Sequence, residues 1–376
     1  MEKRAWDKLG ISTSLIGFGC MRFPVLKDGS IDRKTAEKML DLAYEAGVNY
    51  YDTAYMYHDG ESERFLGEWV KKHDRKSLYV ATKLPVMMID SLEQAKQIFK
   101  EQQEKMQMEQ FDFYLLHALN WDRYKKAKEQ GIVAYCERLK KEGKIKYFGF
   151  SFHDSFEAFE KILMDRDWDF CQIQLNYMDT QEQAGLKGYE LAKEMGVPMV
   201  VMEPVKGGSL ATLPNEIADL FYEVHKELSL SSWAYRFIGS LNNVKVVLSG
   251  MSAIEHVKDN IHTFSPFIPL SREEEQTIEH VKQAIKKRVN NGCTACRYCM
   301  PCPAGVNIPK NFSIWNRFGM YHNVSEIEWA WSNIITDSEK AKNCIRCGKC
   351  EQACPQKLHI RDNLAQLEKE LDNITC

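Results

Sequence analysis

Apolar and polar positions alternate in two different periods along residues 1–270. Short runs that are almost wholly apolar recur at regular spacing, as buried parallel strands do, and stretches with an apolar residue every three to four positions lie between them. The runs predict strands over residues 15–21, 48–54, 78–84, 111–119, 145–152, 170–177, 198–205 and 244–251. Each predicted strand is followed by at least one predicted helix.

The count and length of these units decide the fold class. Eight strand–helix units in about 250 residues are typical of a (β/α)8 TIM barrel. A doubly wound open sheet is the alternative, but it usually has fewer strands and a glycine-rich turn after the first. The Gly17-Phe18-Gly19 segment lacks a third glycine at the spacing of that turn. We therefore predict an α/β fold with a TIM barrel.

Capping signals and prolines predict where elements and domains begin. Asp90 with Glu93 predicts a capping box on the third helix, and Ser271 with Glu274 predicts one on a helix that follows the barrel. A proline-punctuated stretch over residues 263–269 marks the exit from the barrel. We predict a barrel over residues 1–270, a helical linker over 271–291 and a cysteine-rich domain over 292–376.

Composition narrows the cellular setting. The chain has 376 residues, a formal net charge of -3 and no apolar run near the length that spans a bilayer. The first residues lack the apolar core of a signal peptide. We therefore expect a cytoplasmic protein that binds neither nucleic acid nor membrane.

Three consecutive predicted strands each deliver one ionisable group at the same end. Asp52, Lys83 and His117 close the second, third and fourth strands, and Tyr57 follows in the loop after Asp52. In a barrel, these C-terminal strand ends carry the chemistry. A single Asp or His there is more often a cap or a satisfied core group, but four such groups at corresponding positions favour a catalytic site.

The four side chains suit protonation of a carbonyl oxygen that receives a hydride. A lysine ammonium beside a tyrosine lowers the phenol pKa, and an aspartate fixes the lysine and keeps it charged. A histidine on the next strand can hydrogen-bond the substrate carbonyl. Tyr57 would then act as the proton donor.

Several ordered segments of the chain resemble the aldo-keto reductases. They are Gly17–Arg22, Tyr51–Tyr57, Thr82-Lys83, Leu115–His117 and Gly149–Ser151. The resemblance runs from about Trp6 to Ile268 and implies an NADPH-dependent carbonyl reductase on a (β/α)8 barrel. It also implies that Asp52, Tyr57, Lys83 and His117 are the catalytic residues.

The resemblance implies cofactor contacts as well. Ser151 and Gln172 match positions that bind the nicotinamide amide, whereas Glu203 stands where a stacking aromatic is common. The lysine that often binds the 2′-phosphate is missing after the eighth strand, so NADP(H) is the expected cofactor and NAD is possible. The expected contacts are Gly19, Met21, Arg22, Asp52, Ser151, Gln172, Glu203, Val205, Lys206, Gly207, Gly208, Gly250, Met251, Ser252, His256 and Asn260.

Eight of the twelve cysteines lie between Cys293 and Cys354. The second run, from Cys344 to Pro355, has the C-x2-C-x2-C-x3-C-P spacing in which three thiolates bind one iron–sulfur cluster and the fourth binds the other. The first run has the same form except that its last gap is two residues. We predict two [4Fe-4S] clusters: one on Cys293, Cys296, Cys299 and Cys354, the other on Cys344, Cys347, Cys350 and Cys302.

Paired C-x2-C units also bind structural zinc, which is the alternative for this domain. The run resembles bacterial two-cluster ferredoxins interrupted by a largely helical insertion over residues 304–342. We expect Trp315, Trp329 and Trp331 in this insertion to be packing residues. The remaining cysteines, which are Cys20, Cys136, Cys171 and Cys376, are expected to be ordinary thiols.

Three functions remain open at this point. The first is reduction of a small carbonyl substrate, with the clusters accessory or an electron inlet. The second is a ferredoxin-linked reductase fed by the clusters, with a redox partner such as ferredoxin. The third is a redox sensor or electron carrier whose barrel binds nucleotide without turnover. Hydride transfer moves electrons in pairs and clusters move them singly, and we find no flavin motif to interconvert them.

Overall fold

The computed structural model describes residues 1–375, with side chains described through Leu371. The chain divides into two units, one of residues 1–204 and 232–270, the other of residues 205–231 together with the chain from Ser271 onward. Residues 205–231, which the sequence analysis assigned to the barrel domain, group with the cysteine-rich part of the chain. The two units are described separately below.

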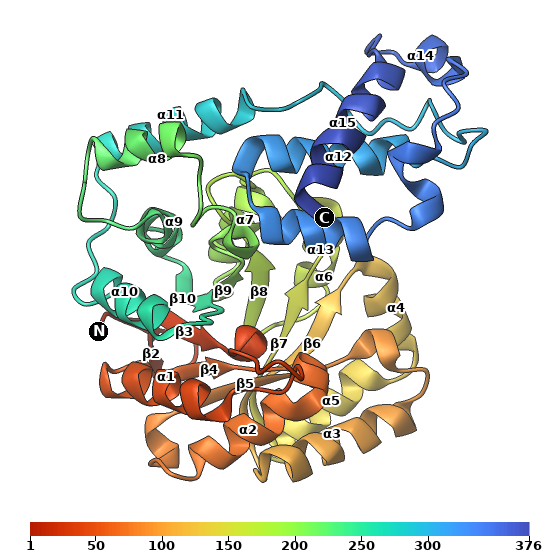
Figure 1. The fold of residues 1–376 in the computed structure, drawn as a ribbon. Coiled ribbons are helices and arrows are strands. Elements are labelled where there is room, and N and C mark those ends of the chain that lie inside the picture. Colours follow the sequence, from red (N-terminus) through yellow and green to blue (C-terminus); the bar gives the residue numbers. More distant parts are fainter. Residues whose placement is uncertain (376) are drawn as a thin grey trace. The chain divides into compact units, whose positions relative to one another are not determined.

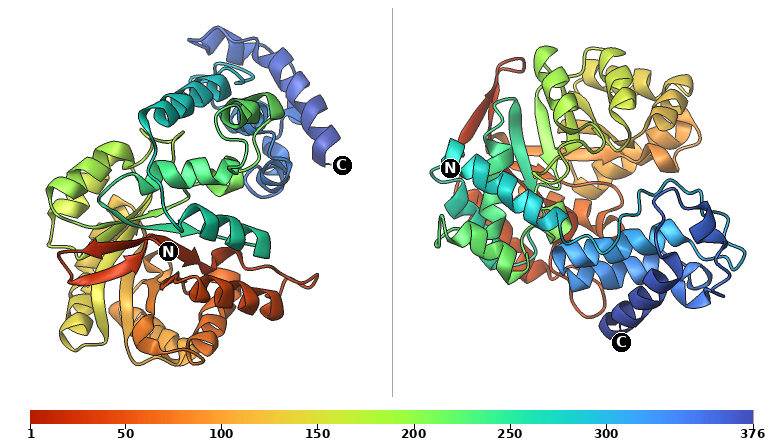
Figure 2. Two further views of the ribbon diagram at one scale, coloured as in Figure 1. Left: turned by 90° about the vertical axis from the view of Figure 1, so that its left-hand side faces the viewer. Right: turned by 90° about the horizontal axis from the view of Figure 1, so that it is seen from above.

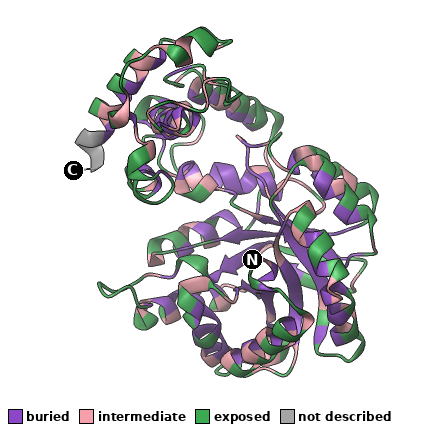
Figure 3. Cartoon of the chain, turned by 90° about the vertical axis from the view of Figure 1, so that its right-hand side faces the viewer, coloured by how far each residue is buried: buried purple, intermediate pink, exposed green. Residues whose placement is uncertain are grey.

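The first unit is a closed barrel of parallel strands wrapped by helices (Figures 1 and 2), which confirms the predicted TIM barrel. The strands, in barrel order, are β10 (Val244–Ser249), β3 (Ile16–Gly19), β4 (Tyr50–Asp52), β5 (Tyr79–Leu84), β6 (Phe111–Leu119), β7 (Ile145–Phe152), β8 (Phe170–Gln174) and β9 (Met199–Met202). The helices are α1 (Arg33–Glu45), α2 (Glu61–Val70), α3 (Leu92–Met106), α4 (Trp121–Glu129), α5 (Ile132–Lys141), α6 (Phe156–Met164), α7 (Gly185–Glu194), α9 (Leu230–Gly239) and α10 (Ile254–Thr263). Figure 3 shows that the strands are buried.

An antiparallel hairpin precedes the barrel and closes its N-terminal end. It consists of β1 (Lys3–Trp6) and β2 (Ile11–Ser14). Trp6 is fully buried, and its ring lies 5.2 Å from that of Phe113 in a cluster that also holds Tyr50 and Phe170. Because these residues lie at or near the starts of their strands, the C-terminal end of the barrel is left for a site.

Helix caps explain one difference between prediction and structure. Ser91, not Asp90, caps α3, because its hydroxyl accepts a hydrogen bond from the Gln94 amide, so the helix begins one residue later than predicted. The box of Ser271 and Glu274 is present at the start of α11 (Arg272–Lys286), as predicted.

The second unit is largely helical, as predicted. Besides α11 it contains α8 (Asn215–Tyr222), α12 (Ile308–Tyr321), α13 (Val324–Asn333), α14 (Lys349–Ala353) and α15 (Ile360–Thr375). Trp315 and Trp331 lie in its apolar core, whereas Trp329 is exposed, so the prediction of packing is wrong for Trp329 alone. Ser209 donates a hydrogen bond of 2.8 Å to Glu326 on α13, which attaches the 205–231 segment to these helices.

Three cysteines outside the two runs are buried thiols without disulfide partners: Cys20, Cys136 and Cys171. Cys376 lies outside the described residues. Within residues 1–375, no helix is both long and apolar enough to cross a membrane.

Candidate active site

The four predicted catalytic residues come from three adjacent strands and one loop. Asp52 ends β4, Lys83 lies near the end of β5, and His117 lies on β6. Tyr57 opens a short turn after β4, in which His58 and Asp59 have left-handed φ angles of 50° and 54°. Such angles carry strain in residues other than glycine, and strain of this kind clusters at functional sites.

The Lys83 ammonium contacts both Asp52 and Tyr57. Its Nζ donates to Asp52 Oδ1 at 2.6 Å, to the Thr53 carbonyl oxygen at 2.7 Å and to the Tyr57 hydroxyl at 3.4 Å. An ammonium has three N–H donors, and all three are used here. Because the Tyr57 oxygen accepts from Lys83, the proton of the phenol itself stays available to another group.

His117 faces Tyr57 from the neighbouring strand. The two rings are 6.0 Å apart and nearly perpendicular. Burial, followed by the repulsion of Lys83, lowers the pKa of His117 to about 3, so its imidazole is neutral near pH 7. Its Nδ1 is buried without a partner among the described residues. After His117 the pairing of β6 with β7 shifts and Ala118 is left-handed, a local irregularity that can re-aim a side chain.

Burial and the neighbouring charges compete in setting the pKa of each group in this cluster. Burial alone would lower the pKa of Lys83, but Asp52 and Tyr57 outweigh it and raise that pKa. Burial raises the pKa of Asp52 despite Lys83. Burial also raises the pKa of Tyr57 by more than Lys83 lowers it. The sequence analysis considered only the lysine, so its expected lowering of the phenol pKa is wrong for the site as a whole.

Two of the expected nicotinamide contacts lie side by side. Ser151 on β7 pairs in register with Gln172 on β8. The Ser151 hydroxyl accepts a hydrogen bond of 2.7 Å from the Ala118 amide, which ties it to the strand of His117. Gln172 is buried, and its Oε1 has no partner among the described residues. An unsatisfied buried amide oxygen is costly and suits a site that a polar ligand completes.

Other expected contacts gather around the end of β10. The Arg22 side chain lies against Gly250, since a Cβ added there would come within 3.1 Å of Arg22 Cδ. The Ser252 amide donates to His256 Nδ1 at 3.3 Å. Asn260 instead donates to Ser249 at 2.9 Å inside the barrel wall, so this part of its side chain is committed to the protein.

The remaining expected contacts are spread over both units. Gly19 ends β3, Met21 is exposed in the following turn (Cys20–Arg22), and Met251 is buried after β10. Glu203 follows β9 with a left-handed φ of 57°. Val205, Lys206, Gly207 and Gly208 belong to the second unit, so the structure does not join them to the tetrad.

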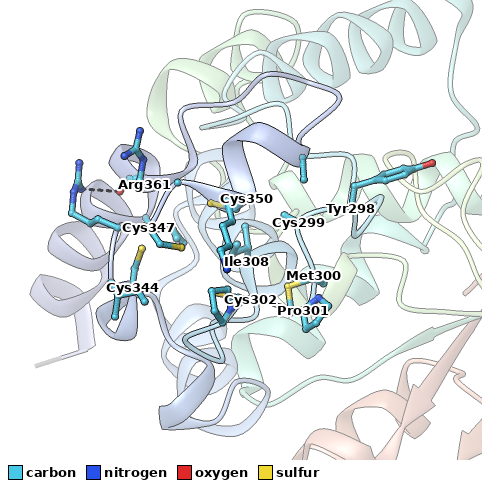
Figure 4. A pocket seen from close by; sticks show the side chains of 17 residues that line it. Tyr298, Cys299, Met300, Pro301, Cys302, Ile308, Cys344, Cys347, Cys350 and Arg361 are labelled. Atoms are coloured by element: carbon cyan, nitrogen blue, oxygen red, sulfur yellow. Dashed lines mark hydrogen bonds between the residues drawn. The ribbon is translucent and has the colours of Figure 1, made fainter.

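The eight clustered cysteines line two cavities of the second unit. Cys293, Cys296, Cys299 and Cys354 line one, of about 20 Å³. Cys302, Cys344, Cys347 and Cys350 line the other, of about 190 Å³, together with Cys299 (Figure 4). Each predicted ligand set therefore shares one cavity, with Cys302 and Cys354 exchanged between the runs. No group of three or more His, Cys, Asp or Glu side chains in the described chain is arranged to hold a single metal ion.

Comparison with known families finds a match for two successive regions of the chain. The model of the aldo/keto reductase family matches residues 15–283. The chain belongs to the aldo/keto reductase family. A second model, the 4Fe-4S dicluster domain, matches residues 292–358. This aldo/keto reductase is therefore an oxidoreductase with an iron–sulfur domain at its C-terminal side.

Individual relatives cover about three quarters of the chain. An uncharacterized oxidoreductase, YqkF of Bacillus subtilis, is 25% identical over 318 residues, which span 76% of this chain and 99% of the relative. The structure of aldo-keto reductase AKR11C1 from Bacillus halodurans in its holo form superposes with a TM-score of 0.62 at 27% identity, covering 75% of this chain and 96% of that one. An aldo-keto reductase from Klebsiella pneumoniae in complex with NADPH has the same fold, with a TM-score of 0.61 at 18% identity over 75% of this chain and 96% of that one.

Sequence reasoning missed a buried network behind Lys83. The Glu63 carboxylate accepts hydrogen bonds from Thr82 at 2.6 Å and from the Gln102 amide at 2.7 Å, and the same amide group contacts the Lys83 carbonyl oxygen at 3.0 Å. Tyr114 donates to the Gln102 side-chain oxygen at 2.7 Å. Glu63 and Gln102 lie on α2 and α3, and only their helical spacing toward the barrel could have indicated their burial.

Proposed function

We propose that this aldo/keto reductase reduces a small carbonyl substrate with NADPH, and that Tyr57 donates the proton. The observation that carries the proposal is that the Lys83 ammonium donates hydrogen bonds to Asp52, Thr53 and Tyr57. This arrangement fixes the phenol oxygen as an acceptor and leaves its proton free for a substrate oxygen. Carbonyl substrates and NADPH fit a family whose solved members include an NADPH complex.

The residues present fit a bound nicotinamide. The Ser151 hydroxyl, which accepts from Ala118, can still donate, and the unsatisfied Gln172 oxygen can accept; the two lie in register on neighbouring strands and match the oxygen and the NH2 group of a carboxamide. Arg22, which packs against Gly250, would hold the nucleotide end together with Ser252 and His256. Gly19, Met21, Glu203, Met251, Asn260 and the Val205–Gly208 segment remain proposed contacts. The bound cofactor supplies the hydride.

The protein's part in the reaction is to hold and deliver one proton. Because the raised pKa keeps Tyr57 protonated at neutral pH, the donor stays loaded until negative charge develops on the carbonyl oxygen. Lys83 then stabilises the phenolate that remains, and Asp52 holds the ammonium in place. The neutral His117 would donate its N–H to the same oxygen and orient the substrate.

Substitution of Tyr57 by Phe tests this role. General-acid catalysis contributes about 10²- to 10⁴-fold, so kcat for NADPH oxidation on a panel of aldehydes and ketones should fall by that factor. Nucleotide affinity should stay unchanged because the ring remains. Tyr55→Phe is the matched control, since the Tyr55 hydroxyl donates to Glu101 at 2.7 Å rather than to the tetrad. Undiminished turnover of Tyr57→Phe would remove the proton-donor role.

The two sets of cysteines match the thiolate donors of two [4Fe-4S] clusters, in accessory or electron-transfer roles. Thiolates at this spacing are the donor set of such clusters, and each predicted set of four shares a cavity with apolar walls that include Ile308. Cys293, Cys296, Cys299 and Cys354 would hold one cluster, and Cys302, Cys344, Cys347 and Cys350 the other. Iron and sulfide analysis of anaerobically purified protein, with an anaerobic spectrum before and after NADPH addition, tests the number of clusters and their connection to the nucleotide.

A further inference from the structure

The larger cysteine cavity opens beside two exposed apolar side chains and two exposed cations. Tyr298 and Ile345 both line this cavity, yet 72% and 67% of their surfaces are accessible. Arg346 and Lys349 line it as well and are exposed, as is Cys347 between them. We call Tyr298, Ile345, Arg346 and Lys349 the basic rim. In Figure 4, Tyr298 projects away from the cysteine side chains.

The electrostatic character of the cavity is one-sided. Its charged lining residues in the described chain are Arg346, Lys349 and Arg361, and all are cations. Asp362 accepts from Arg346 at 2.6 Å and Glu351 accepts from Arg361 at 2.7 Å, but neither carboxylate lines the cavity. Lys349 forms no ion pair with a described residue. Residues 292–360 carry eight Lys and Arg against five Asp and Glu, whereas the whole chain has a net charge of -3.

We propose that the basic rim docks an acidic protein that carries single electrons. This inference rests on the proposed cluster in the larger cavity. One electron leaves the reduced carrier and enters the cluster, so the carrier is oxidised by one electron, and no bond or proton changes hands. An exposed aromatic and an exposed aliphatic side chain beside cations match the core and the charged edge of transient protein interfaces.

The charge of the rim selects among possible occupants. A second copy of this chain that used the same face would bring cations against cations, which disfavours a symmetric dimer. An acidic carrier gains most from Lys349, since Arg346 and Arg361 are already paired with Asp362 and Glu351, and steering by a positive field raises association rates at low ionic strength. An exposed Cys347 also places the proposed cluster near the contact surface, as single-electron exchange between proteins needs.

The test uses the anaerobic holoprotein and a plant-type ferredoxin, an acidic one-electron carrier, as the probe. Stopped-flow absorbance follows cluster reduction, and calorimetry with the oxidised carrier measures affinity. We expect both the rate and the affinity to fall at least tenfold when ionic strength rises from about 50 to about 500 mM. Photoreduced deazaflavin, a small reductant, should reduce the clusters at a rate independent of salt. A basic carrier such as cytochrome c should bind at least tenfold more weakly.

Charge reversal locates the contact. Lys349→Glu should weaken ferredoxin binding about fivefold and leave reduction by deazaflavin unchanged. Lys287→Glu is the matched control, because Lys287 is exposed on the same unit and lines neither cysteine cavity. Iron content is measured for every variant. If Lys349→Glu loses iron, Tyr298→Ala, which lies outside the ligand set, replaces it with the same expectation.

Several outcomes would overturn the inference. These are salt-independent binding, equal binding of the basic carrier, or equal loss in Lys349→Glu and Lys287→Glu. Dimerisation through the rim, seen as a salt-sensitive change in mass, would overturn it in favour of a second copy. Carbonyl turnover that depends on Tyr57 is measured separately, so failure of docking leaves the proposed reduction intact, and failure of that reduction leaves docking intact.

Discussion

The buried ion pair between Lys83 and Asp52 allows the loss of stability on removing either partner to be estimated. Lys83 Nζ and Asp52 Oδ1 are 2.6 Å apart, and the side chains are 0% and 4% exposed. Removing one partner of a buried pair costs about 3–5 kcal/mol because an uncompensated charge remains. We expect Asp52→Asn to lower the free energy of unfolding by about 3 kcal/mol at pH 7, because an amide oxygen still accepts from the lysine. Lys83→Met should lower it by about 5 kcal/mol.

The double variant separates the pair from the packing around it. Asp52→Asn with Lys83→Met leaves no buried charge, so its cost should be smaller than the sum of the single costs by at least about 2 kcal/mol. The chain has two units, and a single unfolding transition need not report on the barrel. Hydrogen exchange measured by mass spectrometry on peptides covering β4 and β5 gives the opening free energy of the barrel itself.

The pH dependence of the Lys83→Met variant provides a second measurement. Burial raises the pKa of Asp52, and removal of the lysine removes the main influence that lowers it. A carboxyl whose pKa is higher in the folded state binds protons more tightly there, so its stabilising contribution is present at low pH and lost as pH rises through the folded-state pKa. The cost of Lys83→Met should therefore shrink toward acid pH. Strictly additive single costs, or a cost that grows toward acid pH, would refute the reasoning.

Three further predictions test other parts of the chain. The imidazole of His117 should stay neutral from pH 5 to pH 8 in a histidine NMR titration, because its pKa is lowered to about 3; a midpoint near the ordinary 6.5 would contradict the burial argument. Cys302→Ser and Cys354→Ser should each lose about half of the iron while the barrel keeps its Tyr57-dependent turnover, and full iron retention in both would exclude the crossed ligand sets. Gly67→Ala should destabilise the chain by about 1–3 kcal/mol in urea unfolding, because the added Cβ would lie 2.3 Å from the Met106 carbonyl oxygen, whereas Gly292→Ala, whose added Cβ would meet only Leu358 Cδ2 at 4.0 Å, should cost less.

The barrel was predictable because its signals repeat. Apolar runs and helical stretches alternate often enough that errors of one or two residues at their ends, such as Asp90 for Ser91, leave the strand order intact. The tetrad was predictable for the same reason, since strand ends of a barrel meet at one face. The grouping of residues 205–231 with the second unit could not be predicted, because their helical pattern does not specify which unit their apolar face packs against.

The sequence did not predict which polar and aromatic helix residues are buried. Glu63 looks like a surface residue of an amphipathic helix beside Glu61 and Arg64, yet it is fully buried behind Lys83 and bonded to Thr82 and Gln102. Trp329 shows the converse, because its neighbour Trp331 is buried and it is not. In both cases the rotation of the helix about its axis determines whether the side chain is buried, and a single charged or aromatic residue does not specify that rotation.

The direction of the Tyr57 pKa shift could not be predicted from the sequence either, and it affects how the proton donor works. A lysine at 3.4 Å favours the phenolate, and this part could be predicted from the residue types. Burial of the phenol opposes the lysine and is the larger effect, and its size depends on the depth of the loop after β4, which the sequence does not specify. A donor with a raised pKa keeps its proton in the resting site and releases it only when the substrate oxygen becomes negatively charged. The lysine therefore acts on the phenolate formed during the reaction, and Lys83→Met should lower kcat more than it lowers nucleotide affinity.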